Sequence, residues 1–149
     1  MTTEDLDRTV RREIYDAVMK IGQPPLAREV AALLGVGLGD TQTSFERLAA
    51  GHVLVLQEGS AEILMAAPFS AVPTPFAVHA QGRQYFGNCI WDALGIPAML
   101  KRDARVTASC GCCGLSMPLE VRGGELQPTE GVVHFAVPAR RWWENIVFT

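Results

Sequence analysis

A cysteine and an aspartate stand three residues apart in an otherwise apolar stretch of this chain, GNCIWDALGIPAML at residues 87–100. Cys89 offers a nucleophilic thiol that also binds soft metals, and Asp92 offers a carboxyl group that can accept and return a proton. On a helix, residues at positions i and i+3 project toward the same side, so both groups can act on one small ligand. A structural interpretation stays open, because a free cysteine is often simply buried.

Three further cysteines crowd into the segment SCGCCGLS at residues 109–116. A structural zinc site needs four ligands, commonly as two separated pairs, and the three histidines of the chain are scattered without ligand spacing. The cluster therefore favours a soft-metal site, if any, in which Cys112 and Cys113 join Cys89 as ligands. Cys110 is expected to serve packing.

The bulk composition describes a folded, non-membrane protein. The chain has 149 residues, of which 48% are hydrophobic and 19% charged, enough for one core or two small subdomains. No apolar run approaches the roughly 20 residues of a membrane-spanning helix, and the charged N-terminus is unlike a secretory signal. We expect no membrane contact, a cytoplasmic location and reduced thiols in place of disulfides.

The charge pattern argues against nucleic acid as a partner. The net charge is −3, and the first 60 residues hold nine acids against six bases. The most plausible recognition helix sets Gln42 and Arg47 beside Asp40 and Glu46, so its polar face is not positive.

The first part of the chain predicts a winged-helix-like helical subdomain at residues 1–66. Apolar residues recur at helical spacing through residues 4–22, and shorter helices are expected at 26–35 and 39–51. Two strands then flank a turn at residues 58–60.

The second part, residues 67–149, predicts an α+β region around a mostly antiparallel sheet. A strand is expected at 76–82, and a helix at 83–94 with Gly95 and Pro97 beyond its end. Strands at 104–109 and 116–122 make the cysteine cluster a hairpin tip. A further strand at 131–138, a short helix at 139–146 and the start of another strand at 146–148 complete the pattern.

The ordered pair RQYFGNCIWDALGIPAML and ARVTASCGCCGLSMPLEV resembles the organomercurial (alkylmercury) lyase family. Members of that family carry a helix with the pattern C-x-x-D, then an ARV element leading to a cysteine-bearing hairpin, after a winged-helix-like start. The resemblance implies that Cys89 is the first mercury-binding cysteine, that Asp92 relays the proton, and that Cys110 supports the fold. Cys112 and Cys113 have no counterpart in the family pattern.

The resemblance implies protonolysis of a carbon–mercury bond to a hydrocarbon and Hg(II). It implies an organomercurial as the small-molecule partner, no required cofactor, Hg(II) as a substrate-derived ligand, and external thiol for product release. The family's second catalytic cysteine falls at Thr149 or just beyond it, and this chain has no cysteine there. We expect either that the chain ends at or just before that site, or that this homologue has lost the cysteine. With Cys89 alone cleavage should be slow, unless Cys112 or Cys113 folds over to supply the second thiolate.

The apolar neighbours Ile90, Trp91, Leu94 and Ile96 are expected to raise the proton affinity of Asp92, as a proton donor near neutral pH requires. Two other functions remain open on the residues alone. One is a non-catalytic protein that binds Hg, Cu or Zn through its thiols. The other is a winged-helix regulator whose thiols sense metal or oxidant.

Overall fold

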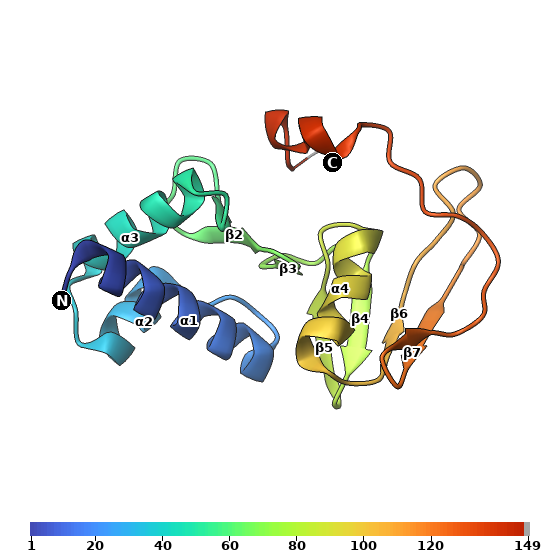
Figure 1. Cartoon of the computed structure of the whole chain (residues 1–149), viewed down its shortest axis with the longest axis horizontal. Coiled ribbons are helices and arrows are strands. Elements are labelled where there is room, and N and C mark those ends of the chain that lie inside the picture. The colour runs from blue at the N-terminus through green and yellow to red at the C-terminus, as the bar shows by residue number, and fades with distance from the viewer. Residues whose placement is uncertain (148–149) are drawn as a thin grey trace.

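A computed structural model describes residues 1–147 of the chain (Figure 1). Three helices come first: α1 (Thr3–Ile21), α2 (Ala27–Leu34) and α3 (Leu38–Ala50). Helix α1 begins with a capping box, in which Thr2 and Asp5 satisfy each other's backbone N–H groups. Its apolar positions Val10, Ile14 and Val18 are buried along one face. The expected three-helix start is therefore present.

A small antiparallel sheet follows the helices, with strands β1 (Leu54–Leu56), β2 (Ile63–Ala66) and β3 (Phe69–Ser70) in that order. The helices and the first two strands enclose one apolar core that includes Phe45 and Leu54. The order of elements is the one from which the winged-helix-like subdomain was predicted, and that assignment stays a prediction.

The second sheet is antiparallel throughout and has the strand order β5-β4-β6-β7-β8. Its elements are β4 (Ala77–Ala80), β5 (Arg83–Phe86), α4 (Ile90–Leu100), β6 (Ala104–Val106), β7 (Leu119–Arg122) and β8 (Glu125–Leu126). A 3₁₀ helix, η1 (Ala139–Glu144), lies at the end of the described chain. The molecule is thus a mixture of helices and antiparallel sheet, as the α+β prediction requires.

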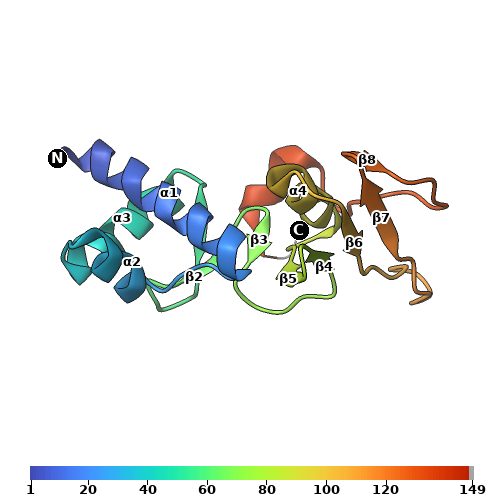
Figure 2. The ribbon, with the colours of Figure 1, turned by 90° about the horizontal axis from the view of Figure 1, so that it is seen from below.

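Helix α4 covers one face of the second sheet and closes a second core that includes Val78, Tyr85 and Ile96. Figure 2 shows α1–α3 at one end of the molecule and β6–β8 at the other, with α4 over the sheet between them. Helix α1 reaches both cores. The Tyr15 hydroxyl donates to the Ala67 carbonyl at 2.9 Å, and the Tyr85 hydroxyl donates to the Met19 carbonyl at 2.8 Å.

The prediction of a helix at 83–94 is wrong at both ends. Residues 83–86 form strand β5, because Gln81 (φ 55°) and Gly82 (φ 71°) make a two-residue turn that returns the chain onto β4. The helix starts only at Ile90, and it contains Gly95 and Pro97. Burial of its apolar face against the sheet outweighs the poor helix propensity of these two residues.

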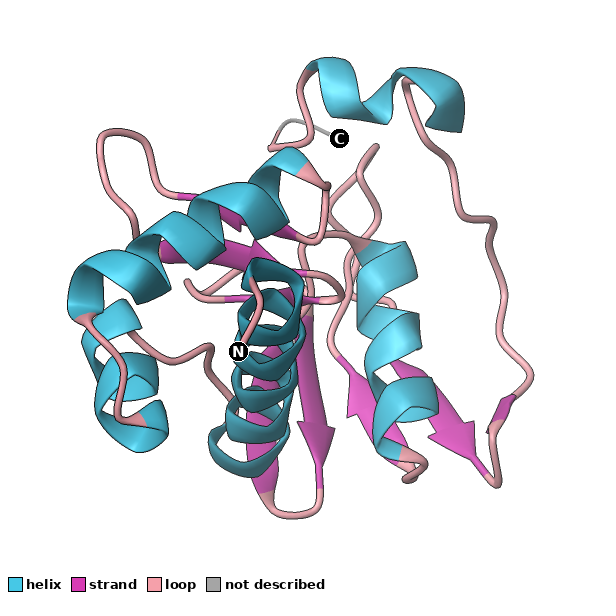
Figure 3. Ribbon diagram, turned by 60° about the vertical axis from the view of Figure 1, so that its left-hand side comes forward, coloured by secondary structure: helices cyan, strands magenta, loops and turns pink. Residues whose placement is uncertain are grey.

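The predicted strand at 131–138 is also absent. This segment is an extended loop with mostly exposed side chains, because no strand lies beside it to complete a ladder. Figure 3 shows the loop running along the outside of the molecule from β8 to η1. The expected helix at 139–146 is present as η1, whereas Ile146 and Val147 lie in a turn and Phe148 lies outside the described residues. Among residues 1–147, no helix combines the length and apolar character needed to cross a bilayer.

Candidate functional site

Cys89 is the N-cap residue of α4, at the point where the chain leaves β5. The preceding Gly87 is fixed from both sides: its N–H donates to the Phe76 carbonyl at 3.0 Å, and its carbonyl accepts from the Thr74 hydroxyl at 2.5 Å. A Cβ added at Gly87 would lie 2.6 Å from the backbone nitrogen of Ala93. Only glycine allows α4 to start this close to the strand end, so Gly87 sets the position of Cys89.

The Cys89 thiol and the Asp92 carboxyl are neighbours, because an N-cap residue and the residue at N3 face each other across the first turn of a helix. Burial raises the pKa of the Cys89 thiol above its ordinary value, and the charge of Asp92 raises it further. The backbone N–H groups of Asp92 and Trp91 oppose this rise electrostatically, although Cys89 makes no conventional cap hydrogen bond.

Burial also raises the pKa of Asp92 above its ordinary value of 3.8, against the opposing effect of interactions with the Asn88 side chain, the Cys89 thiol and the Asn88 backbone. The Asn88 amide therefore contacts the carboxyl on one side while Cys89 contacts it on the other. Asn88 Oδ1 is buried without a hydrogen-bond partner among the described residues. The arrangement places a thiol beside a carboxyl with a raised pKa, and such a carboxylate is a stronger base than an exposed aspartate and is better suited to take the thiol proton.

A pocket of about 260 Å³ opens beside the Cys89 thiol. Its walls come from three separate parts of the chain: Phe76 before β4, residues 88–90 at the start of α4, and the loop and 3₁₀ helix at residues 134–142. The lining residues are Phe76, Asn88, Cys89, Ile90, His134, Phe135, Ala136, Val137 and Trp142. Most of these side chains are apolar, so the pocket suits a small lipophilic ligand with one soft, thiol-seeking atom.

Of the four apolar residues that we expected to surround Cys89 and Asp92, only some do so. Ile90 lines the pocket, but Trp91 is 63% exposed and points outward. Ile96 is buried in the second core and Leu94 packs against it, so both contact the sheet and not the pocket. Phe76, Phe135, Val137 and Trp142 were not singled out from sequence as pocket residues. The adjacent aromatic residues at 142 and 143 are the feature of the sequence from which this wall could have been suspected.

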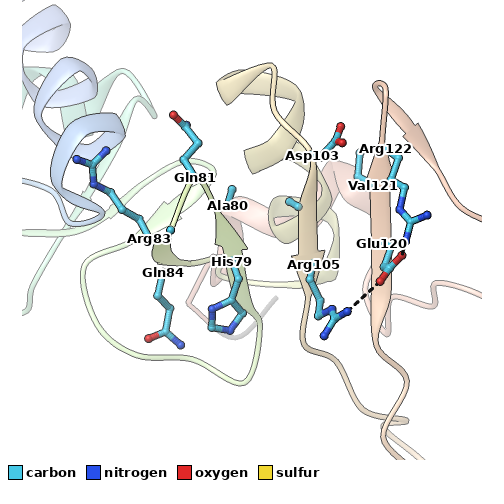
Figure 4. A pocket seen from close by; sticks show the side chains of 12 residues that line it. His79, Ala80, Gln81, Arg83, Gln84, Asp103, Arg105, Glu120, Val121 and Arg122 are labelled. Atoms are coloured by element: carbon cyan, nitrogen blue, oxygen red, sulfur yellow. Dashed lines mark hydrogen bonds and ion pairs between the residues drawn. The ribbon is translucent and has the colours of Figure 1, made fainter.

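A larger pocket, about 610 Å³, lies elsewhere, on the face of the sheet that α4 leaves open (Figure 4). His79, Arg105 and Glu120 stand on adjacent strands there, and the Arg105 guanidinium pairs with the Glu120 carboxylate at 3.1 Å. No cysteine lines this pocket. A soft metal or organometal prefers sulfur to these nitrogen and oxygen groups, so the smaller pocket beside Cys89 is the better candidate.

The other three cysteines lie in the loop between β6 and β7, as the predicted hairpin tip requires. Cys112 and Cys113 are exposed, and Cys110 is partly buried. The N–H groups of Cys113 and Cys112 and the Cys113 thiol lower the pKa of the Cys110 thiol. Within residues 1–147, no three His, Cys, Asp or Glu side chains gather closely enough to hold a metal ion, so Cys89, Cys112 and Cys113 do not form a preassembled site. The family position at Thr149 lies outside the described residues.

Aromatic contacts order the C-terminal segment internally and join it to the first part of the chain. The Trp142 indole N–H donates to the Val137 carbonyl at 2.8 Å, and its ring packs against Phe135 with centroids 4.9 Å apart. The Trp143 ring stacks on His52, with centroids 4.0 Å apart and planes 6° from parallel. One tryptophan therefore forms a pocket wall, and the other attaches this wall to the first part of the chain.

Two comparisons with known proteins found similar proteins. The family model described as MerB, alkylmercury lyase, matches residues 69–149, more than half of the chain. The solved structure titled "Crystal structure of the mercury-bound form of MerB2" is similar in fold, with a TM-score of 0.65 and 24% sequence identity. The similarity covers 80% of this chain and 57% of that one, so the chain spans little more than half the length of that protein. A comparison with curated protein sequences found no match. The match over residues 69–149 shows that the chain belongs to the alkylmercury lyase family.

Proposed function

We propose that this chain is an organomercurial lyase-like protein that cleaves carbon–mercury bonds by protonolysis, with Cys89 and Asp92 as its catalytic residues. The observation that carries the proposal is that Cys89 lines a mostly apolar pocket while its thiol contacts the partly buried carboxyl of Asp92, which is not itself one of the lining residues. The mercury-bound state of the similar MerB2 structure supports mercury as the metal concerned. Here mercury is part of the substrate and not a resident cofactor.

In the first step, the organomercurial R–Hg–X enters the pocket with its organic group against the apolar walls. The Cys89 thiol transfers its proton to the Asp92 carboxylate, the thiolate bonds to mercury, and X leaves. The N–H groups of Asp92 and Trp91 stabilise the thiolate as it forms. The product of this step is R–Hg–S, with the proton stored on Asp92 a short distance from the carbon.

In the second step, Asp92 returns the proton to the carbon attached to mercury. The electron pair of the carbon–mercury bond becomes the new carbon–hydrogen bond, the hydrocarbon leaves, and Hg(II) stays on the thiolate; no oxidant or reductant is needed. Burial raises the pKa of Asp92, so the carboxyl keeps the proton that it took from Cys89 until the carbon accepts it. External thiol then removes the Hg(II).

A second thiolate on mercury would push further electron density onto the carbon and speed the cleavage. Cys112 and Cys113 are the exposed thiols available for this role, and the β6–β7 loop must fold toward Cys89 for either to reach it. We expect the double variant Cys112→Ser, Cys113→Ser to cleave more slowly than the unchanged protein. Undiminished cleavage would remove both residues from the reaction.

The reaction itself is tested by anaerobic incubation with phenylmercury acetate and excess thiol, with benzene measured by gas chromatography. The unchanged protein should release benzene, and Cys89→Ser and Asp92→Ala should fall to the background rate. Glu130→Gln, which alters an exposed carboxyl that is not part of the pocket lining, is the matched control and should keep full activity. Uptake of phenylmercury without benzene release would instead support a soft-metal binder and overturn the lyase.

A further inference from the structure

The β6–β7 loop holds two thiols, Cys110 and Cys113, whose contact with each other plays no part in the proposed reaction. Cys110 and Cys113 have the spacing C-x-x-C, and the turn that carries them is closed by a hydrogen bond from the Gly114 N–H to the Cys110 carbonyl at 2.8 Å. The Cys110 N–H donates to the Leu115 carbonyl at 2.8 Å. These bonds, with the bridge between Ser109 and Ser116, bend the loop back on itself and bring Cys110 and Cys113 into one turn, in which the Cys113 thiol interacts with the Cys110 thiol.

Cys112 lies between these residues, but its thiol does not interact with the Cys110 thiol. It interacts with the Cys110 sulfur through its backbone N–H, whereas Cys113 does so through both its N–H and its thiol. The three thiols of the loop do not converge as a three-ligand group. The loop therefore presents one dithiol, Cys110 with Cys113, and one separate exposed thiol at Cys112.

The surroundings of the dithiol argue against a packing role. Cys113 is exposed, and a Cβ added at Gly111 or Gly114 would meet no atom within 4 Å, so the outer side of the loop is open. Zinc normally takes four ligands, and this pair has no third or fourth partner among the described residues. Hg(II) is satisfied by two thiolates in a linear arrangement, and it prefers sulfur to nitrogen or oxygen ligands.

The dithiol also follows the same end of the sheet as Cys89. Strands β5 and β6 both run antiparallel to β4, and Tyr85 and Val106 both pair with Val78. Cys89 comes four residues after Tyr85, and Cys110 comes four residues after Val106. The two chains leave the sheet roughly 10 Å apart, twice the spacing between adjacent strands. Figure 1 shows the β6–β7 loop extending from the end of the sheet at which α4 begins.

We propose that Cys110 and Cys113 form a second, two-coordinate site for Hg(II), separate from the pocket at Cys89. Hg(II) bonds to both sulfurs, the two thiols release two protons, and no oxidation state changes. Binding at this site does not depend on carbon–mercury cleavage. We further propose that this site accepts the Hg(II) left on Cys89, which rests on the proposed function. The dithiol would then take the product out of the pocket before external thiol removes it from the protein.

The test is titration of the Cys89→Ser protein with mercuric chloride in the presence of a monothiol competitor, followed by the near-ultraviolet sulfur–mercury absorption. This background removes the pocket thiol, so the result is independent of whether the protein cleaves organomercurials. We expect one equivalent of Hg(II) to be held against the competitor. Adding Cys113→Ser should lower the affinity by about a hundredfold or more, because the second sulfur then no longer binds intramolecularly.

The matched control is Cys112→Ser in the same background, which removes an exposed thiol of the same loop and should leave the affinity unchanged. Cys110→Ser should match Cys113→Ser, with circular dichroism to show that both variants remain folded. Equal losses from Cys112→Ser and Cys113→Ser, or tight binding that survives Cys113→Ser, would overturn the proposal. Benzene release by the protein with Cys89 intact tests the lyase separately.

Discussion

The thiol and the carboxyl at the start of α4 affect each other's ionisation. Burial raises the pKa of both groups, and each senses the other, because the Asp92 charge opposes formation of the Cys89 thiolate. At neutral pH, the free protein therefore keeps most of Cys89 protonated. A mercury atom at the sulfur replaces that proton, so the thiol becomes a ligand only when the substrate is present.

This coupling predicts the behaviour of Asp92→Asn. Removing the carboxylate takes away a negative charge that raises the pKa of Cys89, so the thiol should ionise at lower pH. The measurement is the rate of alkylation by iodoacetamide against pH, in a protein whose other three cysteines are serine. The midpoint should shift to lower pH for Asp92→Asn and stay in place for Glu130→Gln. A midpoint that is unchanged, or that moves upward, would show that the two groups are not coupled.

Helix α4 is positioned by the close approach of its first turn to Gly87. In Gly87→Ala, the new methyl group would lie 2.6 Å from the Ala93 nitrogen and 2.8 Å from its Cα, and both are backbone atoms that cannot rotate away. We expect a loss of roughly 1–3 kcal/mol in the free energy of unfolding, and slower benzene release, because α4 must shift and carry Cys89 and Asp92 with it.

Gly95→Ala is the matched comparison for this prediction, since it adds the same methyl group within α4 itself, eight residues after Gly87. Its nearest contact is the Pro68 side chain at 3.6 Å, an ordinary packing distance, and alanine favours a helix over glycine. Urea unfolding should show a gain of up to about 1 kcal/mol. A Gly87→Ala protein as stable and as active as Gly95→Ala would contradict this account of how the site is positioned.

Helices α1 and α3 are joined by a single polar cluster at the edge of the first core. The Asp7 carboxylate accepts from Arg47 Nε at 2.8 Å, from Arg47 Nη2 at 2.6 Å and from the Ser44 hydroxyl at 2.6 Å. The bonds from Arg47, with further help from Ser44, hold the pKa of Asp7 below its ordinary value of 3.8. A depressed carboxyl pKa stabilises the fold above that ordinary value, and this contribution is lost as pH falls through the folded-state value.

Asp7→Asn should therefore lower the urea midpoint most at neutral pH, and the difference from the unchanged protein should shrink as pH falls below 3.8. Glu58→Gln, in the exposed turn between β1 and β2, is the control and should change the midpoint little at any pH. A difference for Asp7→Asn that stays constant with pH would mean that the cluster stabilises the fold through shape and not through charge.

The elements that the sequence predicted correctly are those in which local pattern and burial agree, such as α1 with its capping box and its apolar stripe. Strand β5 was missed because its decisive signal is the backbone of Gln81 and Gly82, and a positive φ at glutamine leaves little trace in composition. The segment at 131–138 has β-branched residues but no partner strand, and a strand depends on its neighbour.

The candidate site shows the same division. Cys89 and Asp92 were selected because both lie in one short motif, although they meet at a helix N-terminus and not along the helix face that the sequence indicated. The pocket around them combines Phe76 with residues 134–142, which lie more than 50 positions further along the chain. Only the tertiary fold brings these parts together, so periodicity within a segment could not identify them.

The pocket depends on both parts of the molecule, because the C-terminal segment that forms one of its walls contacts a residue between α3 and β1. Trp143 is 44% exposed, yet its ring lies flat on His52, at the junction of α3 and β1. The adjacent Trp142 is a pocket wall. Because η1 follows a long loop with few buried side chains, this stacking contact joins the wall to the first part of the chain, while Trp142 packs within the wall against Phe135 and Val137.

Trp143→Ala should therefore open the pocket without altering the catalytic pair. We expect a bulky maleimide to modify Cys89 several-fold faster in this variant, measured at one pH in a protein whose other three cysteines are serine. Trp91→Ala removes an equally large ring that is 63% exposed on α4, and it should leave the rate nearly unchanged. If both variants react at the rate of the parent protein, residues 134–142 do not limit access to the thiol. The pocket would then be open to organomercurials whatever the position of η1, and the first part of the chain would have no influence on the chemistry of the second.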